Sequence, residues 1–197
     1  NFTTPGADGS FGAGSGYGGA GGTSLSSAGD VNGDGFDDII VGANDSAYVV
    51  YGNASGNMVN LSSGSIAADK GFKIIGGAGS GLGTDVSGAG DMNGDGLDDL
   101  LVGAPGSKTT YVVYGSTNAS TVNVSTGTIA ASVGFKITGG TSNFGYSVSN
   151  AGDLNGDGLA DMIVGEYGYN GAMVGAAWAI YGSKTRTTID MANISGE

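Results

Sequence analysis

The sequence has no cysteine and no histidine, and it has only 6 lysine and arginine residues among 197. Without cysteine there is no disulfide framework. Without histidine the chain lacks the usual general base, the common nucleophile pairs and most zinc ligands. No apolar run approaches the roughly 18 residues of a membrane-spanning helix, and no basic stripe is present to bind nucleic acid. These absences argue against a histidine-dependent enzyme, a membrane span and a nucleic-acid partner.

The 18 acidic residues are concentrated rather than spread along the chain. Eleven of them lie in three short segments, so the rest of the chain is nearly neutral although the net charge is −12. Clustered carboxylates repel one another unless a cation neutralises them. The clusters therefore indicate cation sites. They consist of Asp30, Asp34, Asp37 and Asp38, then Asp91, Asp95, Asp98 and Asp99, and then Asp153, Asp157 and Asp161.

Each cluster belongs to a longer repeat. The segment from Ala28 to Ala43 recurs almost unchanged at residues 89–104 and again at residues 151–165. The first acids of the three copies are Asp30, Asp91 and Asp153, so the spacing between copies is almost constant. Such a period indicates three equivalent structural units. We divide the chain into an N-terminal extension of residues 1–9 and repeats at residues 10–70, 71–133 and 134–197.

All local signals within a unit predict strands. Short apolar runs at residues 39–41, 100–102 and 162–164 end at glycine, as expected of strands buried on both faces. Segments such as Tyr48-Val49-Val50-Tyr51 are rich in β-branched and aromatic residues. No stretch has a sustained helical period. Each unit therefore supplies about four short strands, and the predicted fold class is all-β, with consecutive four-stranded blades of the propeller type.

The acidic clusters have the spacing of a loop that binds calcium through oxygen ligands. With Asp30 as position 1, Asn32, Asp34 and Asp38 occupy positions 3, 5 and 9, and position 7 offers a backbone carbonyl. Calcium takes about six to eight oxygen ligands, and a glycine at position 6 permits the sharp turn that brings them together. The predicted ligands are Asp30, Asn32, Asp34, Phe36 and Asp38 in the first loop, Asp91, Asn93, Asp95, Leu97 and Asp99 in the second, and Asp153, Asn155, Asp157, Leu159 and Asp161 in the third.

Position 8 is Asp37, Asp98 and then Ala160, whereas position 9 is aspartate in every copy. We therefore predict that position 9 binds the ion and position 8 faces outward. An EF-hand needs an acid at position 12, where these loops have valine, and nonapeptide β-roll repeats would recur at a far shorter period. Turns with incidental acids are the remaining alternative. Three Ca²⁺ ions are expected, one in each loop.

The loop is followed by an apolar strand and Gly103-Ala104-Pro105, and Phe144-Gly145 precedes the third copy. In these features the chain resembles the FG-GAP repeat and is similar to repeats in the integrin α-subunit propeller and in large bacterial secreted proteins. The resemblance implies a calcium loop between the inner two strands of each blade and an outer strand of the Gly-Phe-Lys-Ile type, as at residues 71–74 and 134–137. Propellers have about four to eight blades, so three repeats suggest a partial β-propeller or a self-assembling arc.

The same resemblance implies a non-enzymatic module, extracellular or on the cell surface, in which calcium rigidifies β-blades used for adhesion or assembly. The partner of such a module could be a surface protein or a glycan. A calcium-dependent lectin, which is a carbohydrate-binding propeller, is an alternative function. A glycoside-cleaving enzyme using Glu166 is a weaker one, because the clustered acids are better explained as calcium ligands and Glu166 as a solvated turn residue. Aromatic residues that could stack on a sugar are Tyr17, Tyr146, Tyr167, Tyr169 and Trp178.

The partner predicted for the chain is a second copy of itself. Phe11, in the segment at residues 10–12, precedes Asp30 by the same separation at which Phe72 precedes Asp91. The N-terminal segment therefore matches an outer strand without a preceding blade, while the third repeat has no matching outer strand. Strand addition between copies would build a ring or a filament. Neighbouring blades of a longer protein are the alternative partners.

Overall fold

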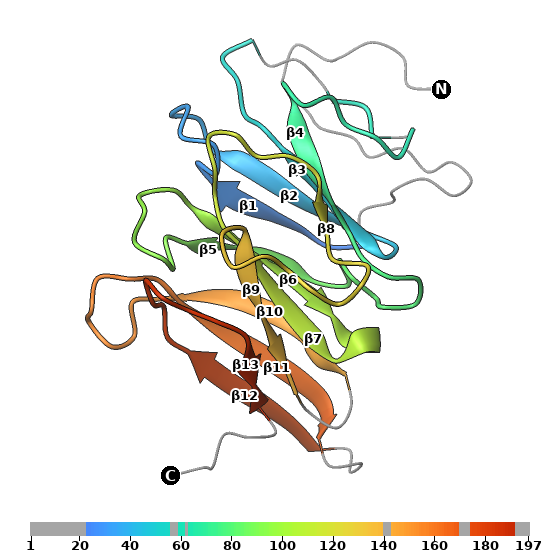
Figure 1. The fold of residues 1–197 in the computed structure, drawn as a ribbon, viewed down its shortest axis with the longest axis vertical. Coiled ribbons are helices and arrows are strands. Elements are labelled where there is room, and N and C mark those ends of the chain that lie inside the picture. The colour runs from blue at the N-terminus through green and yellow to red at the C-terminus, as the bar shows by residue number, and fades with distance from the viewer. Residues whose placement is uncertain (1–22, 56–58, 62, 140–142, 170–173, 192–197) are drawn as a thin grey trace.

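The computed structural model describes residues 23–55, 59–61, 63–139, 143–169 and 174–191. Three sheets follow one another along the long axis of the molecule, and helical conformation in these ranges is confined to the short 3₁₀ turn η1 (Pro105–Ser107) and to Met191 (Figure 1). No helix in the described part of the chain is long and apolar enough to cross a membrane. The predicted all-β fold of consecutive propeller-type blades is confirmed.

Each blade is built around antiparallel strands that follow one another in the sequence. The first blade contains β1 (Leu25–Gly29), β2 (Asp38–Ala43), β3 (Ser46–Val50) and β4 (Gly71–Ile75). The second contains β5 (Val86–Gly90), β6 (Asp99–Ala104), β7 (Thr109–Val113) and β9 (Gly134–Thr138). The third contains β10 (Phe144–Gly152), β11 (Asp161–Tyr169) and β12 (Val174–Ile180).

The predicted strands are found where the repeat places them. The three apolar runs lie in β2, β6 and β11, and the Gly-Phe-Lys-Ile segments are the outer strands β4 and β9. Phe72 pairs with Val49, and Phe135 pairs with Val112. The third sheet has three strands among the described residues. The N-terminal segment around Phe11 lies outside the described residues.

Two short strands cross from one blade to the sheet of the blade before it. β8 (Val122–Asn123) comes from the second blade and pairs in parallel with β4. β13 (Ile189–Asp190) comes from the third blade and pairs in parallel with β9 in the same way. The first and second sheets therefore have five strands instead of the four predicted. A two-residue strand is too short to show a hydrophobic period in the sequence.

The hydrophobic core lies between the blades. We call the face of a blade that points toward the following blade its forward face, and the opposite face its backward face. Ile40 and Val49 on the forward face of the first blade pack against Val102 of the second. Leu101 and Val112 pack in the same way against the third blade. Because burial of apolar side chains is the main favourable contribution to folding, these two interfaces hold the blades together.

The forward face of the third blade differs from the other two. Ile163 occupies the position in the third repeat that Ile40 and Leu101 occupy in the first two. Those two side chains are fully buried, whereas Ile163 is 39% exposed. Leu154 occupies the position of Val31 in the first repeat. Val31 is buried, whereas Leu154 is 52% exposed. The prediction that the apolar run in β11 is buried on both faces is therefore wrong for its forward side. The reason is that the described residues place no fourth blade against it.

Candidate metal loops

The three acidic loops occupy equivalent places in the fold. Each one joins the first strand of a blade to the second: residues 30–37 join β1 to β2, residues 91–98 join β5 to β6, and residues 153–160 join β10 to β11. In Figure 1 they lie along one side of the molecule, at the left of the view. The fold thus presents three copies of the loop in a row.

Backbone amides of the loop surround the carboxylate at position 1. Asp30 Oδ1 accepts hydrogen bonds from the N–H groups of Gly33 (2.8 Å) and Asp34 (3.1 Å), and its Oδ2 accepts one from Gly35 (2.8 Å). Asp91 and Asp153 are bonded in the same pattern. Gly33 and Gly35 have φ of 76° and 87°, a conformation that glycine adopts without strain. The glycines of the repeat therefore allow the tight turn that the sequence predicted.

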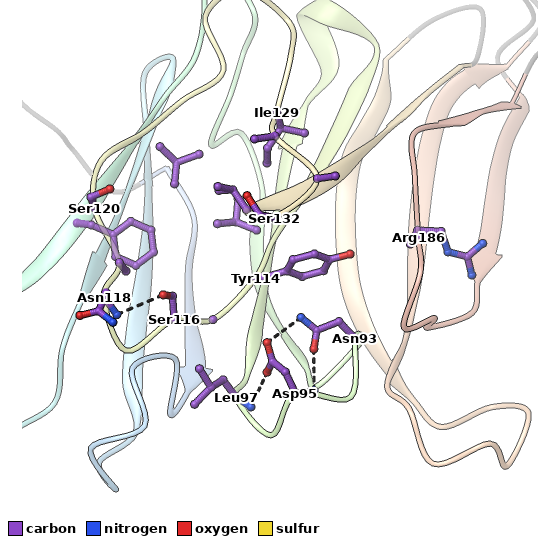
Figure 2. Close-up of a pocket in the computed structure, with 18 of the residues that line it drawn as sticks. Asn93, Asp95, Leu97, Tyr114, Ser116, Asn118, Ser120, Ile129, Ser132 and Arg186 are labelled. Carbon is purple, nitrogen blue, oxygen red and sulfur yellow. Dashed lines mark hydrogen bonds between the residues drawn. The ribbon is translucent and has the colours of Figure 1, made fainter.

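The side chains at positions 3 and 5 face each other within the loop. Asn93 Nδ2 donates to Asp95 Oδ2 at 2.9 Å, and Asp95 Oδ1 accepts the N–H of Leu97 at 2.9 Å (Figure 2). The first and third loops repeat these bonds. In the third loop the N–H of Leu159, with help from Asn155, lowers the pKa of Asp157 below its ordinary value. Positions 1, 3, 5 and 7 thus form one compact turn in every copy.

The aspartates at position 9 are completely buried. Asp38 Oδ2 accepts the N–H of Val31 at 3.0 Å, and its Oδ1 accepts that of Gly52 at 2.8 Å. Asp99 and Asp161 repeat both bonds. Burial raises the pKa of Asp38 to about 6 and that of Asp99 to about 7, and the other loop carboxylates add to the shift. The anionic forms of Asp38 and Asp99 are therefore held at a free-energy penalty that a nearby cation would relieve.

The donor set fits calcium in kind and number. Every side chain at positions 1, 3, 5 and 9 carries oxygen, and a carboxylate that accepts two hydrogen bonds keeps about two lone-pair sites for an ion. Among the residues that the structure describes, however, no three Asp, Glu, His or Cys side chains are arranged to hold a metal ion. The carboxylates would have to move closer together on binding. The calcium ligands named from the sequence therefore remain a prediction.

A groove lies beside the second loop. Its volume is about 970 Å³, and its lining includes Asn93, Asp95, Tyr114 and the segment at residues 115–123. Figure 2 shows Asn93 and Asp95 below the ring of Tyr114. A smaller groove of about 450 Å³ lies beside the first loop and includes Asn32, Asp34 and Tyr51 at the equivalent positions. Positions 3 and 5 of both loops are therefore reachable by a dissolved ion.

Each of the first two loops is also bonded to the blade that follows it. Asp30 O accepts the N–H of Asp98 at 3.2 Å, and Val31 O accepts that of Ser116 at 2.8 Å. Between the second and third blades, the N–H groups of Ala160 and Ser183 repeat these bonds at 2.9 Å and 2.8 Å. The order of a loop therefore affects the contact between two blades as well as its own turn.

Position 8 does not face outward in the second loop, which corrects the prediction. Asp98 Oδ2 accepts the N–H of Asp30 at 2.8 Å and lies over Gly29, which leaves no room for a side chain there. The carboxylate therefore connects the second blade to the first. Ala160 can replace it in the third loop because the backbone N–H bond to the preceding loop is kept. One sequence gives no sign of this contact, since the partner belongs to the preceding repeat.

Replacing Asp98 by alanine is expected to lower the free energy of unfolding by about 1–3 kcal/mol, because a charge-assisted hydrogen bond between blades is lost. The matched control is Asp37→Ala, at the same position of the first loop, where the side chain is exposed. Urea denaturation of both variants in calcium-containing buffer measures the difference. Equal effects of the two substitutions would contradict the assigned role of Asp98.

Glu166 and the exposed aromatic residues lie outside the loops. Glu166 is not a solvated turn residue: it lies in β11, is 2% exposed and accepts a 3.4 Å hydrogen bond from Trp178 Nε1. It is buried because its side chain points to the backward face of the blade. Tyr146 and Tyr167 are about half exposed, with ring centroids 6.1 Å apart. Tyr17 and the side chain of Tyr169 lie outside the described residues.

Comparison with known proteins identifies the repeat. The FG-GAP repeat profile matches residues 82–124 and 144–180, and the FG-GAP-like repeat profile matches residues 30–102. Integrin alpha-7 of Mus musculus is 32% identical over 147 residues, which is 69% of this chain and 11% of that protein. Integrin alpha pat-2 of Caenorhabditis elegans is 31% identical over 177 residues, 79% of this chain and 13% of that protein. Integrin alpha-M of Mus musculus is 38% identical over 84 residues, 41% of this chain and 7% of that protein. The chain thus spans about a tenth of the length of these curated relatives.

Proposed function

The chain belongs to the FG-GAP repeat family, and from that premise we propose that it is a calcium-binding structural module of an extracellular or cell-surface protein. Calcium in the three loops would rigidify the blades, and the blades would serve adhesion or assembly. Millimolar calcium outside cells suits sites of moderate affinity. FG-GAP repeats of the integrin α type are adhesion-related modules, and we assign this chain no catalytic role.

The observation that carries the proposal is that the three loops have the same structure. All three repeat the same backbone turn, the same contact between positions 3 and 5, and the same buried carboxylate at position 9. A buried carboxylate next to two others is unfavourable without a compensating charge. Three independent copies of that arrangement are better explained by a bound cation than by incidental acids in turns.

The exposed aromatic residues support a lectin less well than the three loops support a calcium-binding module. Tyr146 and Tyr167 lie in the strands of the third blade, whose forward face is open in the described part of the chain. Trp178 is partly buried and packs against the core between the second and third blades. The exposure of the two tyrosines therefore follows from the open face, and no sugar is needed to account for it.

Calcium titration by isothermal calorimetry tests the proposal. We expect three bound ions per chain, and two for Asp95→Ala, because a position-5 carboxylate of the second loop is removed. Asp69→Ala is the matched control, since this aspartate is exposed, lies outside the loops and pairs with Lys70 at the surface. A stoichiometry below three for the unaltered chain, or one that Asp95→Ala leaves unchanged, would refute the assignment.

A further inference from the structure

The asparagine at position 3 of every loop is followed by glycine. The three pairs are Asn32-Gly33, Asn93-Gly94 and Asn155-Gly156. Asparagine is one of the chemically labile residues, because the backbone nitrogen of the next residue can attack its side-chain amide carbon. Glycine has no Cβ atom to hinder that nitrogen. The three glycines are exposed, so water reaches the place where this reaction would occur.

The folded loop holds the attacking nitrogen. The N–H of Gly94 donates to Asp91 Oδ1 at 2.6 Å, and the first and third loops repeat this bond at 2.8 Å and 2.7 Å. To attack, the nitrogen must lose its proton, and the resulting anion would lie beside the carboxylate that accepts it. Like charges so close together repel each other. The position-1 carboxylate therefore opposes the reaction as long as the loop is closed.

The amide group under attack is held as well. Asn93 Nδ2 donates to Asp95 Oδ2 at 2.9 Å, and Asn93 Oδ1 accepts the N–H of Asp95 at 2.8 Å (Figure 2). The other two loops repeat both bonds. Attack requires the amide to rotate until its carbon faces the glycine nitrogen, which breaks both bonds. The reaction thus requires the loop to open, and local opening becomes rarer as the loop becomes more stable.

We propose that Asn32, Asn93 and Asn155 are deamidation sites that the closed loop protects and that bound calcium protects further. The glycine nitrogen forms a bond to the asparagine Cγ, the Cγ–Nδ2 bond breaks, and ammonia leaves with the proton that the nitrogen gave up. Water then opens the cyclic imide. If the bond between nitrogen and Cγ breaks, the product is aspartate. If the bond between nitrogen and the backbone carbonyl carbon breaks, the product is isoaspartate.

Calcium that binds the closed loop but not the open one lowers the open fraction. At a calcium concentration about 100 times the dissociation constant, the open fraction falls by about 100-fold. Protection by calcium rests on the proposed function, whereas protection by the hydrogen bonds of the loop does not.

The two products have different effects on the loop. Aspartate keeps an oxygen ligand at position 3 and adds a negative charge, which suits calcium. Isoaspartate lengthens the main chain by one carbon atom between positions 3 and 4. The N–H groups of positions 4, 5 and 6, which donate to the position-1 carboxylate, are then displaced from it. A period without calcium therefore leads to a permanent loss of calcium sites.

The test is peptide mapping by mass spectrometry after incubation of the intact chain in mildly alkaline buffer, with calcium or with excess chelator. The temperature is kept well below the melting transition in both buffers, which circular dichroism checks. We expect deamidation at the three sites in chelator and at least about tenfold slower deamidation in calcium. Asn118 and Asn123 are the matched controls, because they are exposed but precede alanine and valine. They should stay unchanged in both buffers.

Asp91→Ala separates protection by the loop from protection by calcium. In chelator, this variant should deamidate Asn93 about tenfold faster than the unaltered chain, because the N–H of Gly94 loses a charged acceptor. Asn32 in the same molecule should keep its rate, which shows that the first loop stays folded.

Absence of deamidation at the three sites in chelator, or equal rates at Asn93 in Asp91→Ala and in the unaltered chain, would overturn the proposal. Equal rates in calcium and in chelator would overturn it too, if calorimetry shows three bound ions. If calorimetry detects no calcium binding, the proposed function fails and protection by calcium fails with it. The comparison of Asp91→Ala with the unaltered chain in chelator then decides whether the loop itself protects its asparagine.

Discussion

Chelation of calcium is expected to lower the melting temperature of the chain by on the order of 20 °C. At a calcium concentration about 100 times the dissociation constant, each site stabilises the fold by about 2.7 kcal/mol, so three sites contribute about 8 kcal/mol. For a chain of this size, about 1 kcal/mol shifts the melting temperature by roughly 2–4 °C. Differential scanning calorimetry in calcium and in excess chelator measures the shift.

The loss of stability on chelation should exceed the loss expected if calcium stabilised only the three turns themselves. The reason is that each of the first two loops is also bonded to the next blade, through Asp30 O and Asp91 O. Magnesium is the matched control. It demands a smaller, octahedral site and should restore little of the stability. Identical melting curves with and without chelator would contradict the role assigned to the loops.

Replacing Gly103 by alanine is expected to destabilise the fold by about 3 kcal/mol or more. A Cβ atom at this position would lie 2.1 Å from the carbonyl oxygen of Gly145 in the next blade. Overpacking usually costs about 1–3 kcal/mol, and here the clash is with backbone, which can yield only if the blades separate. Urea denaturation in calcium-containing buffer gives the change in the free energy of unfolding.

The chain offers its own control for this substitution. Gly165 occupies the same position in the third blade, and the nearest atom to a Cβ there is the Cβ of Ser147 in the same blade, at 3.4 Å. Gly165→Ala should therefore change stability by less than about 1 kcal/mol. Equal destabilisation by Gly103→Ala and Gly165→Ala would show that the two faces are equivalent in solution and would contradict the open forward face of the third blade.

The strands and the loops could be read from the sequence because their signals are local and repeated. The run from Ile39 to Val41 and the Gly-Phe-Lys-Ile segments identify strands by composition alone, and three aligned copies fix their order. The spacing from Asp30 to Asp38 likewise gives the turn. Repetition makes such a prediction strong, because an accidental match would not recur twice more at an almost constant interval.

Contacts between blades could not be read in this way. Asp98 bonds to a residue in the preceding blade, and β8 and β13 join sheets built from residues far away in the sequence. Asp85 is a further case: Oδ1 accepts the hydroxyl of Ser24 and Oδ2 accepts the N–H of Val148, both at 2.8 Å, so one carboxylate connects three blades. Each of these contacts involves a partner that comes close only when the blades stack on one another.

Crystals grown in calcium and measured for anomalous scattering test the central claim most directly, because they locate the ion itself. The account predicts three anomalous peaks, one in each loop. Each peak should lie about 2.3–2.6 Å from the oxygens at positions 1, 3, 5 and 9 and from the carbonyl at position 7. Loops without a peak, in which Asp38, Asp99 and Asp161 still bond only to backbone N–H groups, would contradict it.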